Sequence, residues 1–438
     1  MAPALGRMLR SSPYWPVVSD RTLRRALPGF AFSALGHGMA AVGVSWLAIE
    51  LAPAGSRGAW VAVAVAAYTL PGAAGALLLG RFLRDRDPVR LVRWDASLRA
   101  VALGLIPVAY ALDALDGPLY VGLLAVSSVL HSWGQAGVYT LLARVLPERD
   151  HLAGNAVLST VFSLATVIGP ALAGALIAWT GAAVVVIAVD AVAFLVLAIV
   201  FRFVSAPEDA PVGGQAGGQA ERTAEGPVEP GAAPPPRPAG LTIIRNDPAL
   251  FGVLGLSFGF FFLFGPVYVA LPLYVSEDLR GSASLLSGFY TAFGVGAVLG
   301  ALVSGYLSRW RLWPTVIGIV IGFGIFLLPV GLGAFTPVAM ASFALAGLVW
   351  PPYSSLSTTL VQRAARGPEL AQVLAVNSSV RVVSVPLGTA LGGPLVAAFG
   401  SGRTLQISAV GILALGIASA LALGLRTAGK ARSVRPRK

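Results

Sequence analysis

The sequence predicts an all-α membrane protein in which twelve transmembrane helices form two pseudo-symmetric six-helix bundles. Three observations lead to this prediction: the composition, the spacing of long apolar runs, and an internal repeat. Of the 438 residues, 56% are hydrophobic and 11% are charged, whereas an ordinary soluble domain has about 25% charged residues. Because the lipid-facing surface of a membrane protein must be apolar, a bilayer accounts for this excess.

The apolar runs are long enough for spanning helices, which need about 20 mainly apolar residues each. In the first half we expect spans near residues 26–51, 58–80, 92–112, 118–143, 152–178 and 182–203. In the second half we expect them near residues 249–275, 283–308, 312–333, 337–361, 371–398 and 404–425.

These spans divide the chain into domains. We expect a basic cytoplasmic N-terminus over 1–25, six-helix bundles over 26–203 and 249–425, and a basic cytoplasmic tail over 426–438. Residues 204–248 are rich in Pro, Gly and Ala, so they are predicted to form a flexible cytoplasmic linker.

Positive charge is distributed unevenly about these spans. The net charge is +12, and of the 31 Lys and Arg residues only Arg99 and Arg381 lie inside apolar segments. All the others except Arg57, Arg280 and Arg403 fall on one side of the predicted topology. This asymmetry follows the positive-inside rule and places both termini in the cytoplasm. It disfavours a nucleic-acid partner, and the absence of Cys excludes disulfides.

An internal repeat relates the two halves. Residues 169–176, with the sequence GPALAGAL, resemble residues 388–395, with the sequence GTALGGPL, at an offset of 219. The same offset aligns Thr140, Leu141 and Arg144 with Thr359, Leu360 and Arg363. A parallel six-plus-six repeat predicts a substrate site between the halves, near the bilayer midplane.

At these residues the sequence resembles the major facilitator superfamily, and within it the twelve-span exporters of the macrolide-efflux and enterobactin-exporter types. The stretches that carry the resemblance are 155–156, 168–174, 190–194, and 271–274 followed by Gly294, Gly296 and Gly300. The resemblance implies a monomeric secondary active exporter in the plasma membrane that uses proton antiport and alternating access. Two alternatives stay open: a facilitator or symporter that imports a solute on the same fold, and a non-transporting membrane enzyme or assembly factor.

Two short motifs are similar to motifs of that family. Asp85, Arg86 and Arg90 match the acidic and basic positions of its cytoplasmic gating loop, although Pro88 replaces a Gly. The resemblance implies charge contacts that close the cytoplasmic side; the alternative is a basic loop that serves only topology. Gly169, Pro170 and Gly174 resemble the span-five motif of antiporters, and the alternative is a plain packing interface.

Several ionisable residues lie within the predicted spans. By depth, His37 and His131 reach the midplane, where imidazole would carry a proton or hydrogen-bond the substrate; the alternative is a neutral His bonded to a helix carbonyl. For Asp190 we favour a structural polar contact over proton coupling. Arg381 would attract an anionic group or form an internal salt bridge, and Glu50 ends span one as a proton-access group or a solvated helix end.

Asp95 and Arg99 are spaced i,i+4 near the cytoplasmic end of span three, and Arg99 is expected to reach the membrane interface. The other candidates for the cavity wall, given the spans that line it in the family, are aromatic or polar. They are Trp133, Gln135, Tyr139, Phe261, Tyr268, Trp350 and Tyr353, in addition to His37 and His131. Such a wall suits a bulky, partly apolar substrate.

The sequence contains no nucleotide-binding loop of the G-x-x-x-x-G-K-S/T type and no H-E-x-x-H metal motif. Its three His residues include His151 in a loop. We therefore expect a transporter without a cofactor, a metal or an enzymatic activity of its own.

Overall fold

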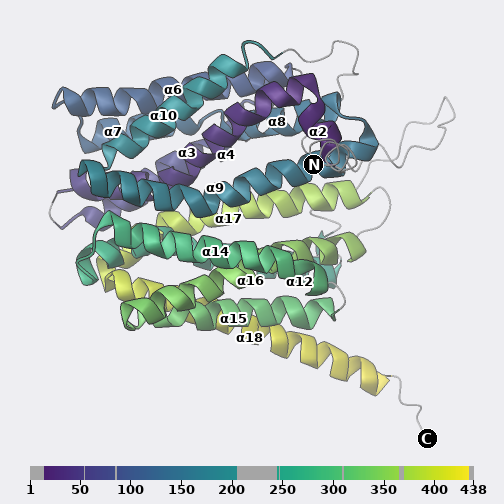
Figure 1. Cartoon of the computed structure of the whole chain (residues 1–438). Helices are drawn as coiled ribbons and strands as arrows, with labels where there is room; N and C mark the ends of the chain where they lie inside the picture. Colours follow the sequence, from purple (N-terminus) through teal and green to yellow (C-terminus); the bar gives the residue numbers. More distant parts are fainter. Residues whose placement is uncertain are drawn as a thin grey trace, which may run out of the picture. The chain divides into compact units, whose positions relative to one another are not determined.

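The chain folds almost entirely into helices (Figure 1). The computed structural model describes residues 14–53, 55–83, 86–204, 244–245, 247–307, 310–364 and 369–433. Within those residues there is no β-strand, and each of the predicted spans is helical.

The first half contains the six predicted spans and three short helical pieces. The elements are α2 (Trp15–Ser19), α3 (Arg21–Leu51), α4 (Arg57–Leu78), α5 (Gly80–Leu83), α6 (Pro88–Ala111), α7 (Gly117–Ser128), α8 (His131–Val145), η1 (Glu148–Asp150), α9 (His151–Thr180) and α10 (Val184–Val200). Span four is therefore divided into α7 and α8, with the break at Val129 and Leu130.

The second half repeats this plan. Its elements are α12 (Pro248–Phe264), α13 (Val267–Leu273), η2 (Tyr274–Asp278), α14 (Ala283–Leu307), α15 (Leu312–Gly331), α16 (Thr336–Ala364), α17 (Glu369–Phe399) and α18 (Ser401–Ser433). Span seven consists of α12, α13 and η2, while span ten is the single helix α16 despite Pro351 and Pro352.

Length and hydropathy alone identify six of the described helical segments as able to cross a membrane. These are Arg21–Leu51, Ala153–Thr180, Pro248–Asp278, Ala283–Ser304, Leu312–Gly331 and Ser401–Gly424. The helix α6 is not among these segments, and it carries Arg90, Arg93, Asp95 and Arg99.

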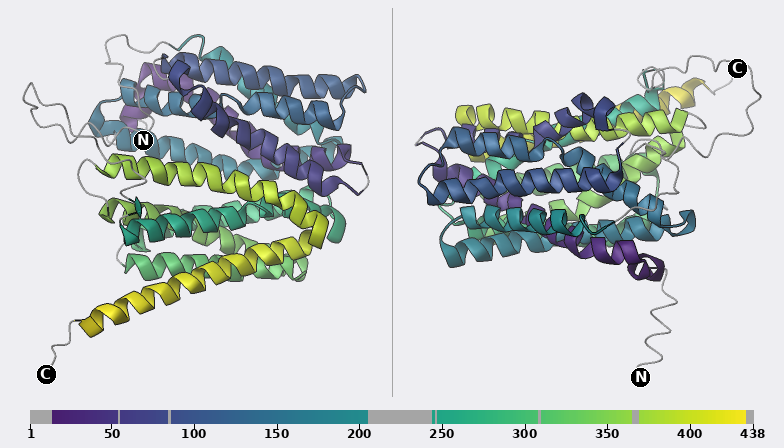
Figure 2. Two further views of the ribbon diagram at one scale, coloured as in Figure 1. Left: turned by 180° about the vertical axis from the view of Figure 1, so that it is seen from behind. Right: turned by 90° about the horizontal axis from the view of Figure 1, so that it is seen from above.

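Internal contacts divide the chain into two compact units. The first comprises Met1–Ala216 with Val275–Thr291, and the second comprises Gly217–Tyr274 with Ala292–Lys438. Within each unit, neighbouring helices run side by side (Figure 2). The predicted boundaries of the bundles and of the linker remain predictions.

The repeat has a structural counterpart in the way helices cross. In the first unit α3 and α9 approach so closely that a Cβ added to Gly169 would lie 2.6 Å from the carbonyl carbon of Gly38. In the second unit a Cβ added to Gly388 would collide with the carbonyl oxygen of Phe262, and one on Gly265 would collide with Thr389. Because Gly169 and Gly388 differ by 219 positions, the offset in the sequence marks the same backbone crossing in both units.

Prolines inside the spans leave carbonyl groups that need other donors. Pro71 in α4 has no N–H, so the carbonyl of Ala67, four residues earlier, lacks its helical partner. The hydroxyl of Ser128, at the end of α7, donates a hydrogen bond to that carbonyl at 3.0 Å. After the break, the hydroxyl of Ser132 on α8 donates a hydrogen bond to the carbonyl of Gly72 at 2.9 Å. The two halves of span four are thus attached separately to α4.

The crossing at Gly388 gives a prediction. We expect Gly388→Ala to lower the thermal denaturation midpoint in detergent, because the new methyl group overpacks a backbone contact at a cost of about 1–3 kcal/mol. Gly255→Ala in α12 is the matched control, since nothing lies within 4 Å of a Cβ at that position. An equal midpoint for the two variants would contradict the close crossing.

Candidate functional site

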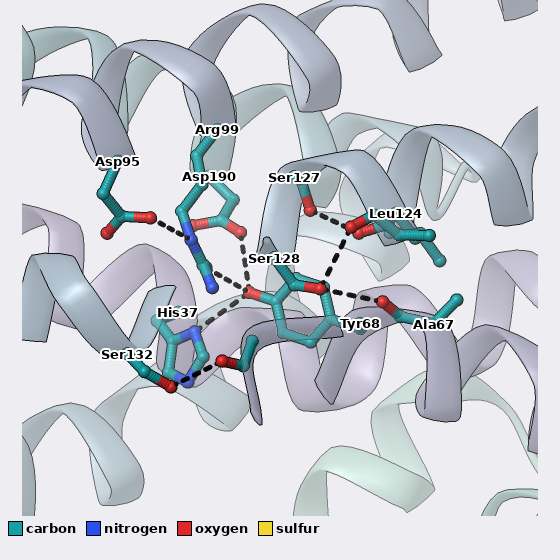
Figure 3. A network of polar contacts seen from close by, with 12 residues as sticks. His37, Ala67, Tyr68, Asp95, Arg99, Leu124, Ser127, Ser128, Ser132 and Asp190 are labelled. Atoms are coloured by element: carbon teal, nitrogen blue, oxygen red, sulfur yellow. Dashed lines mark hydrogen bonds and ion pairs between the residues drawn. The ribbon is translucent and has the colours of Figure 1, made fainter. Parts of the chain in front are cut away.

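Polar side chains from five helices meet inside the first unit (Figure 3). This polar cluster consists of His37 on α3, Tyr68 on α4, Asp95 and Arg99 on α6, His131 on α8, and Asp190 on α10. Arg99 and Asp190 are both 0% exposed. Charged groups inside a membrane span are costly and are retained mainly where they serve a function or are paired.

Arg99 is at the centre of the cluster. Its Nε lies 3.4 Å from Oδ1 of Asp95, and its Nη1 donates a hydrogen bond to the hydroxyl of Tyr68 at 3.4 Å. Its guanidinium also lies 4.9 Å from the ring centroid of Phe194. The expectation that Arg99 reaches the membrane interface is therefore wrong: α6 turns this residue toward the bundle interior, where two carboxylates lie.

The Tyr68 hydroxyl joins three partners. It contacts Nδ1 of His37 at 2.9 Å, donates to Oδ2 of Asp190 at 3.4 Å, and accepts from Arg99. A phenol has a single proton to donate. If that proton points to Asp190, then His37 must carry its own proton on Nδ1; if it points to His37, then His37 accepts it. The hydroxyl therefore links the imidazole to the carboxyl group.

Glycines on neighbouring helices make room for the two carboxylates. A Cβ on Gly36 of α3 would lie 2.6 Å from Oδ1 of Asp190. A Cβ on Gly134 of α8 would collide with Oδ2 of Asp95. The carboxylates thus sit directly against the backbones of α3 and α8, and larger residues at these positions would displace them.

A small cavity adjoins the cluster. Its volume is about 30 Å³, and a site of that size holds one or two water molecules. Its lining includes Ser33, His37, Asp95, His131 and Gln135. Within the described residues, Nδ1 of His131 has no hydrogen-bond partner. The rings of His37 and His131 stack with centroids 5.4 Å apart. The cavity thus brings a carboxyl group, two imidazoles and a carboxamide together.

The corresponding region of the second unit is aromatic. Spans seven to ten each contribute a ring to it, in this order: Phe264, Phe293, Phe323 and Trp350. In the first unit, spans one to four contribute His37, Tyr68, Arg99 and His131 in the same order. Phe264 and Trp350 have ring centroids 4.7 Å apart. Phe264 lies directly before the crossing glycine Gly265, and His37 lies directly before the crossing glycine Gly38. Trp350 aligns with His131 at the repeat offset of 219 residues. In the described residues, the second unit therefore has aromatic rings on the spans that correspond to those carrying ionisable side chains in the first unit.

The predicted wall residues fall into these two units. In the first, Trp133 donates from Nε1 to the carbonyl of Gly75 at 3.1 Å, and Tyr139 is 40% exposed on α8. In the second, Phe261 and Tyr353 are 3% and 0% exposed. Tyr353 shares a hydrogen bond of 2.9 Å with Ser257. In this conformation Phe261 and Tyr353 belong to the packed interior.

Tyr268 and Trp350 pack in the same aromatic region. The ring of Tyr268 lies edge-on to Phe264, with centroids 5.1 Å apart. Trp350 contacts Phe260, Phe261 and Phe264. Of the aromatic residues proposed for a substrate wall, the four in the second unit thus belong to one continuous cluster, whereas Trp133 and Tyr139 lie in the first unit.

The loop after span two makes an ion pair that the sequence did not predict. Asp87 begins α6 by accepting from the backbone N–H of Arg90, and its Oδ1 lies 3.6 Å from Nη1 of Arg144 at the end of α8. Of the predicted gate residues, Asp85 lies outside the described residues, Arg86 donates to the carbonyl of Phe82 at 3.5 Å, and Arg90 is exposed. The sequence Asp87-Pro88 is a helix-start signal that would have identified Asp87.

The remaining candidates have simple placements. Gly169 and Pro170 are buried in α9, and the carbonyl of Gly174 accepts from the hydroxyl of Ser284 at 3.2 Å. Glu50 is exposed at the end of α3. The backbone of Arg381 lies in α17, and its side chain is outside the described part of the structure. Sequence analysis missed three features: the contacts of Asp87, the role of Tyr68 in the middle of span two, and the burial of Arg99.

Comparison with known proteins identifies relatives over most of the chain. Residues 26–389 match the profile of the Major Facilitator Superfamily. An uncharacterised MFS-type transporter of Sinorhizobium fredii is 25% identical, with 81% of this chain and 82% of the relative covered. The multidrug efflux pump Tap of Mycolicibacterium fortuitum is 26% identical, with 89% and 93% covered.

A solved structure shares the fold. It is a bacterial homologue of the human lysosomal transporter Spinster, in an inward-facing and unoccupied conformation. The TM-score is 0.59 at 12% sequence identity, with 92% of this chain and 94% of the other chain covered. At that identity the likeness concerns the fold alone.

The burial of Arg99 gives a prediction. Arg99→Met removes the only cation beside Asp95 and Asp190 among the described residues of the cluster. Losing one partner of a buried pair costs on the order of 3–5 kcal/mol, so we expect a large fall in the thermal denaturation midpoint. Adding Asp95→Asn removes one stranded carboxylate and should recover part of the loss. Arg403→Met, at an exposed position of α18, is the control. If Arg99→Met melts like this control, the cluster is not what holds the first unit together.

Proposed function

This chain belongs to the Major Facilitator Superfamily, and from that premise we propose that it is a secondary active exporter of small, bulky and partly apolar molecules. Its two six-helix bundles would alternate access to a central substrate site, and a proton moving inward would drive each export cycle. We place it in the plasma membrane as a monomer with both termini in the cytoplasm. The family is one of transporters rather than enzymes.

The similarity to Tap supports efflux. That relative is a multidrug efflux pump and is matched over 93% of its length, so the likeness extends over both halves of the transporter. The half-buried rings of the aromatic cluster in the second unit, Tyr268, Phe293 and Trp350, support a partly apolar substrate, because rings offer stacking and apolar contact without a fixed hydrogen-bond pattern. A sugar or nucleotide would need more polar donors and acceptors.

A charge count supports proton coupling. The polar cluster holds one cation, Arg99, and two carboxylates, Asp95 and Asp190. With both carboxylates ionised and both imidazoles neutral, it carries one net negative charge around the buried side chains of Arg99 and Asp190. Burying an uncompensated charge is unfavourable, so the cluster favours one additional proton. This is the single observation on which the coupling proposal depends.

The geometry suggests how that proton is shared. Asp95 and His131 line the small cavity, whereas Asp190 is reached through the Tyr68 hydroxyl and His37. We therefore propose that Asp190 carries the coupling proton as well as making a structural contact, and that His37 and Tyr68 relay it. One proton crossing about 100 mV supplies about 2.3 kcal/mol, which is enough for roughly fiftyfold accumulation of a neutral substrate.

Transport in reconstituted vesicles tests the function. We expect a fluorescent cationic or neutral aromatic drug to accumulate in proteoliposomes whose interior is made acidic, because the outward proton gradient drives antiport into the lumen. A protonophore should abolish the accumulation. Uptake that ignores the gradient would indicate a facilitator, and uptake that requires the opposite gradient would indicate a symporter.

Coupling and substrate movement can be separated by mutation. Asp190→Asn fixes the carboxyl position in a neutral state, so gradient-driven uptake should fall at least tenfold while exchange of labelled for unlabelled substrate continues. Tyr68→Phe should slow the gradient-driven rate by interrupting the relay. Gradient-driven uptake by Asp190→Asn at the unaltered rate would remove Asp190 as the carrier.

His131 gives a third test. We expect His131→Ala to weaken transport or to shift its pH dependence while expression is unchanged, because this imidazole lines the small cavity beside Asp95 and stacks on His37. His151→Ala is the matched control: that ring contacts the carbonyls of Ala143 and Leu146 at the end of α8. Identical pH profiles from pH 5 to 8 for both variants and the unaltered protein would exclude His131.

A further inference from the structure

A groove lies between α6 and α10 at the arginine-rich end of the first unit. Its volume is about 420 Å³. Arg93 and Ser97 of α6 line one side, and Leu195 and Ile199 of α10 line the other. Arg202, just beyond the end of α10, completes it. Leu195 and Ile199 are 49% and 47% exposed, so the groove opens on an apolar outer face.

The second unit has a similar groove at its own arginine-rich end. Its volume is about 470 Å³, and its lining includes Trp310, Arg311 and Trp313 at the start of α15. Arg363 at the end of α16 and Leu423 of α18 also line it. Trp310 is 65% exposed. Indole rings of this kind are enriched where a membrane meets water.

The two grooves occupy equivalent places in the repeat. The helices α6 and α10 are spans three and six, and α15 and α18 are spans nine and twelve. Each groove lies along such a pair, with α16 also lining the second groove, and each contains two arginines. Two independent halves therefore keep the same combination of cationic and apolar surface.

In both grooves, the positive charge of the arginines is not balanced by negatively charged protein side chains among the lining residues. No carboxylate is among the residues that line either groove. The described residues provide no ion pair for Arg93, Arg202, Arg311 or Arg363. A pair of guanidinium groups binds a phosphate through parallel N–H···O hydrogen bonds. The exposed leucine, isoleucine and tryptophan side chains require an apolar neighbour.

We propose that each groove binds one anionic phospholipid of the cytoplasmic leaflet. The two arginines hold the phosphate and its negatively charged headgroup, and the acyl chains lie along the apolar wall. The assignment to that leaflet rests on the proposed topology, in which the arginine-rich ends face the cytoplasm. The surface of this leaflet is negative and attracts basic segments next to the membrane. A free anion would satisfy the arginines and leave the apolar wall uncovered.

Binding of defined lipids to the purified full-length protein tests this proposal. Native mass spectrometry would count retained phosphatidylglycerol during a titration, with phosphatidylcholine and inorganic phosphate in separate arms. We expect two sites for phosphatidylglycerol, at least tenfold weaker retention of phosphatidylcholine, and no displacement by millimolar phosphate. The measurement needs no substrate or gradient, so its outcome is independent of the exporter proposal.

Paired variants assign the two sites. The double variant Arg93→Gln with Arg202→Gln should remove one tight lipid site. The double variant Arg311→Gln with Arg363→Gln should remove the other site, and the variant with all four changes should remove both. The corresponding Arg→Lys variants should retain lipid more weakly, and they provide a folded comparison if a Gln variant is unstable. Arg280→Gln with Arg403→Gln, on the opposite side, is the control and should retain both sites. Any of three results would overturn the proposal. The number of bound lipids could be unchanged in both Gln double variants, phosphatidylcholine could be retained as well as phosphatidylglycerol, or inorganic phosphate alone could displace the phosphatidylglycerol.

Discussion

The buried ion pair of Arg99 with Asp95, which the Tyr68 hydroxyl extends to Asp190, is the constraint on which the first unit depends. A guanidinium at 0% exposure cannot be neutralised by losing a proton, so the surrounding helices must supply negative charge and hydrogen-bond acceptors. Asp95 on the same helix and Asp190 on α10 supply the charge, and Tyr68 on α4 supplies an acceptor. Glycines at positions 36 and 134 bring α3 and α8 close enough to enclose the carboxylates. One residue thus determines the packing of several spans.

The repeat shows how one architecture supports two kinds of chemistry. Both units use a glycine crossing, at Gly38 and Gly169 in the first and at Gly265 and Gly388 in the second. Immediately beside that crossing the first unit places an imidazole and the second a phenyl ring. A cluster of ionisable side chains and a cluster of aromatic rings thereby lie in different halves of the same fold. In the proposed cycle, this division lets one half respond to protons while the other offers apolar contact to a substrate.

Sequence patterns predicted the helices well because a bilayer demands long apolar runs whatever the tertiary contacts are. The i,i+4 pairing of Asp95 with Arg99 was also predictable, since it depends only on helix geometry. The break in span four was not, because it depends on Ser128 and Ser132 reaching carbonyls of α4. The burial of Arg99 was not predictable either. The position of a residue along α6 gives its depth in the membrane, but it does not show the direction in which the side chain points.

The site was predictable in part for the same reason. His37, His131 and Asp190 are conspicuous as polar residues in apolar runs, but Tyr68 is not, because tyrosine is common in spans and its role arises from three neighbours on other helices. Asp87 is not one of the residues at which the loop after span two resembles the family motif. Its position directly before Pro88, at the start of α6, is the feature that identifies it. Local patterns find helices and caps, whereas a network that joins five helices requires the packed structure.

The most direct test of the central claim is the number of protons released when substrate binds to the purified protein, measured with a pH indicator in weakly buffered detergent solution. If the polar cluster holds one exchangeable proton that substrate binding displaces, about one proton per protein should be released near neutral pH, and Asp190→Asn should release none. Release of no proton by the unaltered protein, with substrate binding intact, would contradict the account.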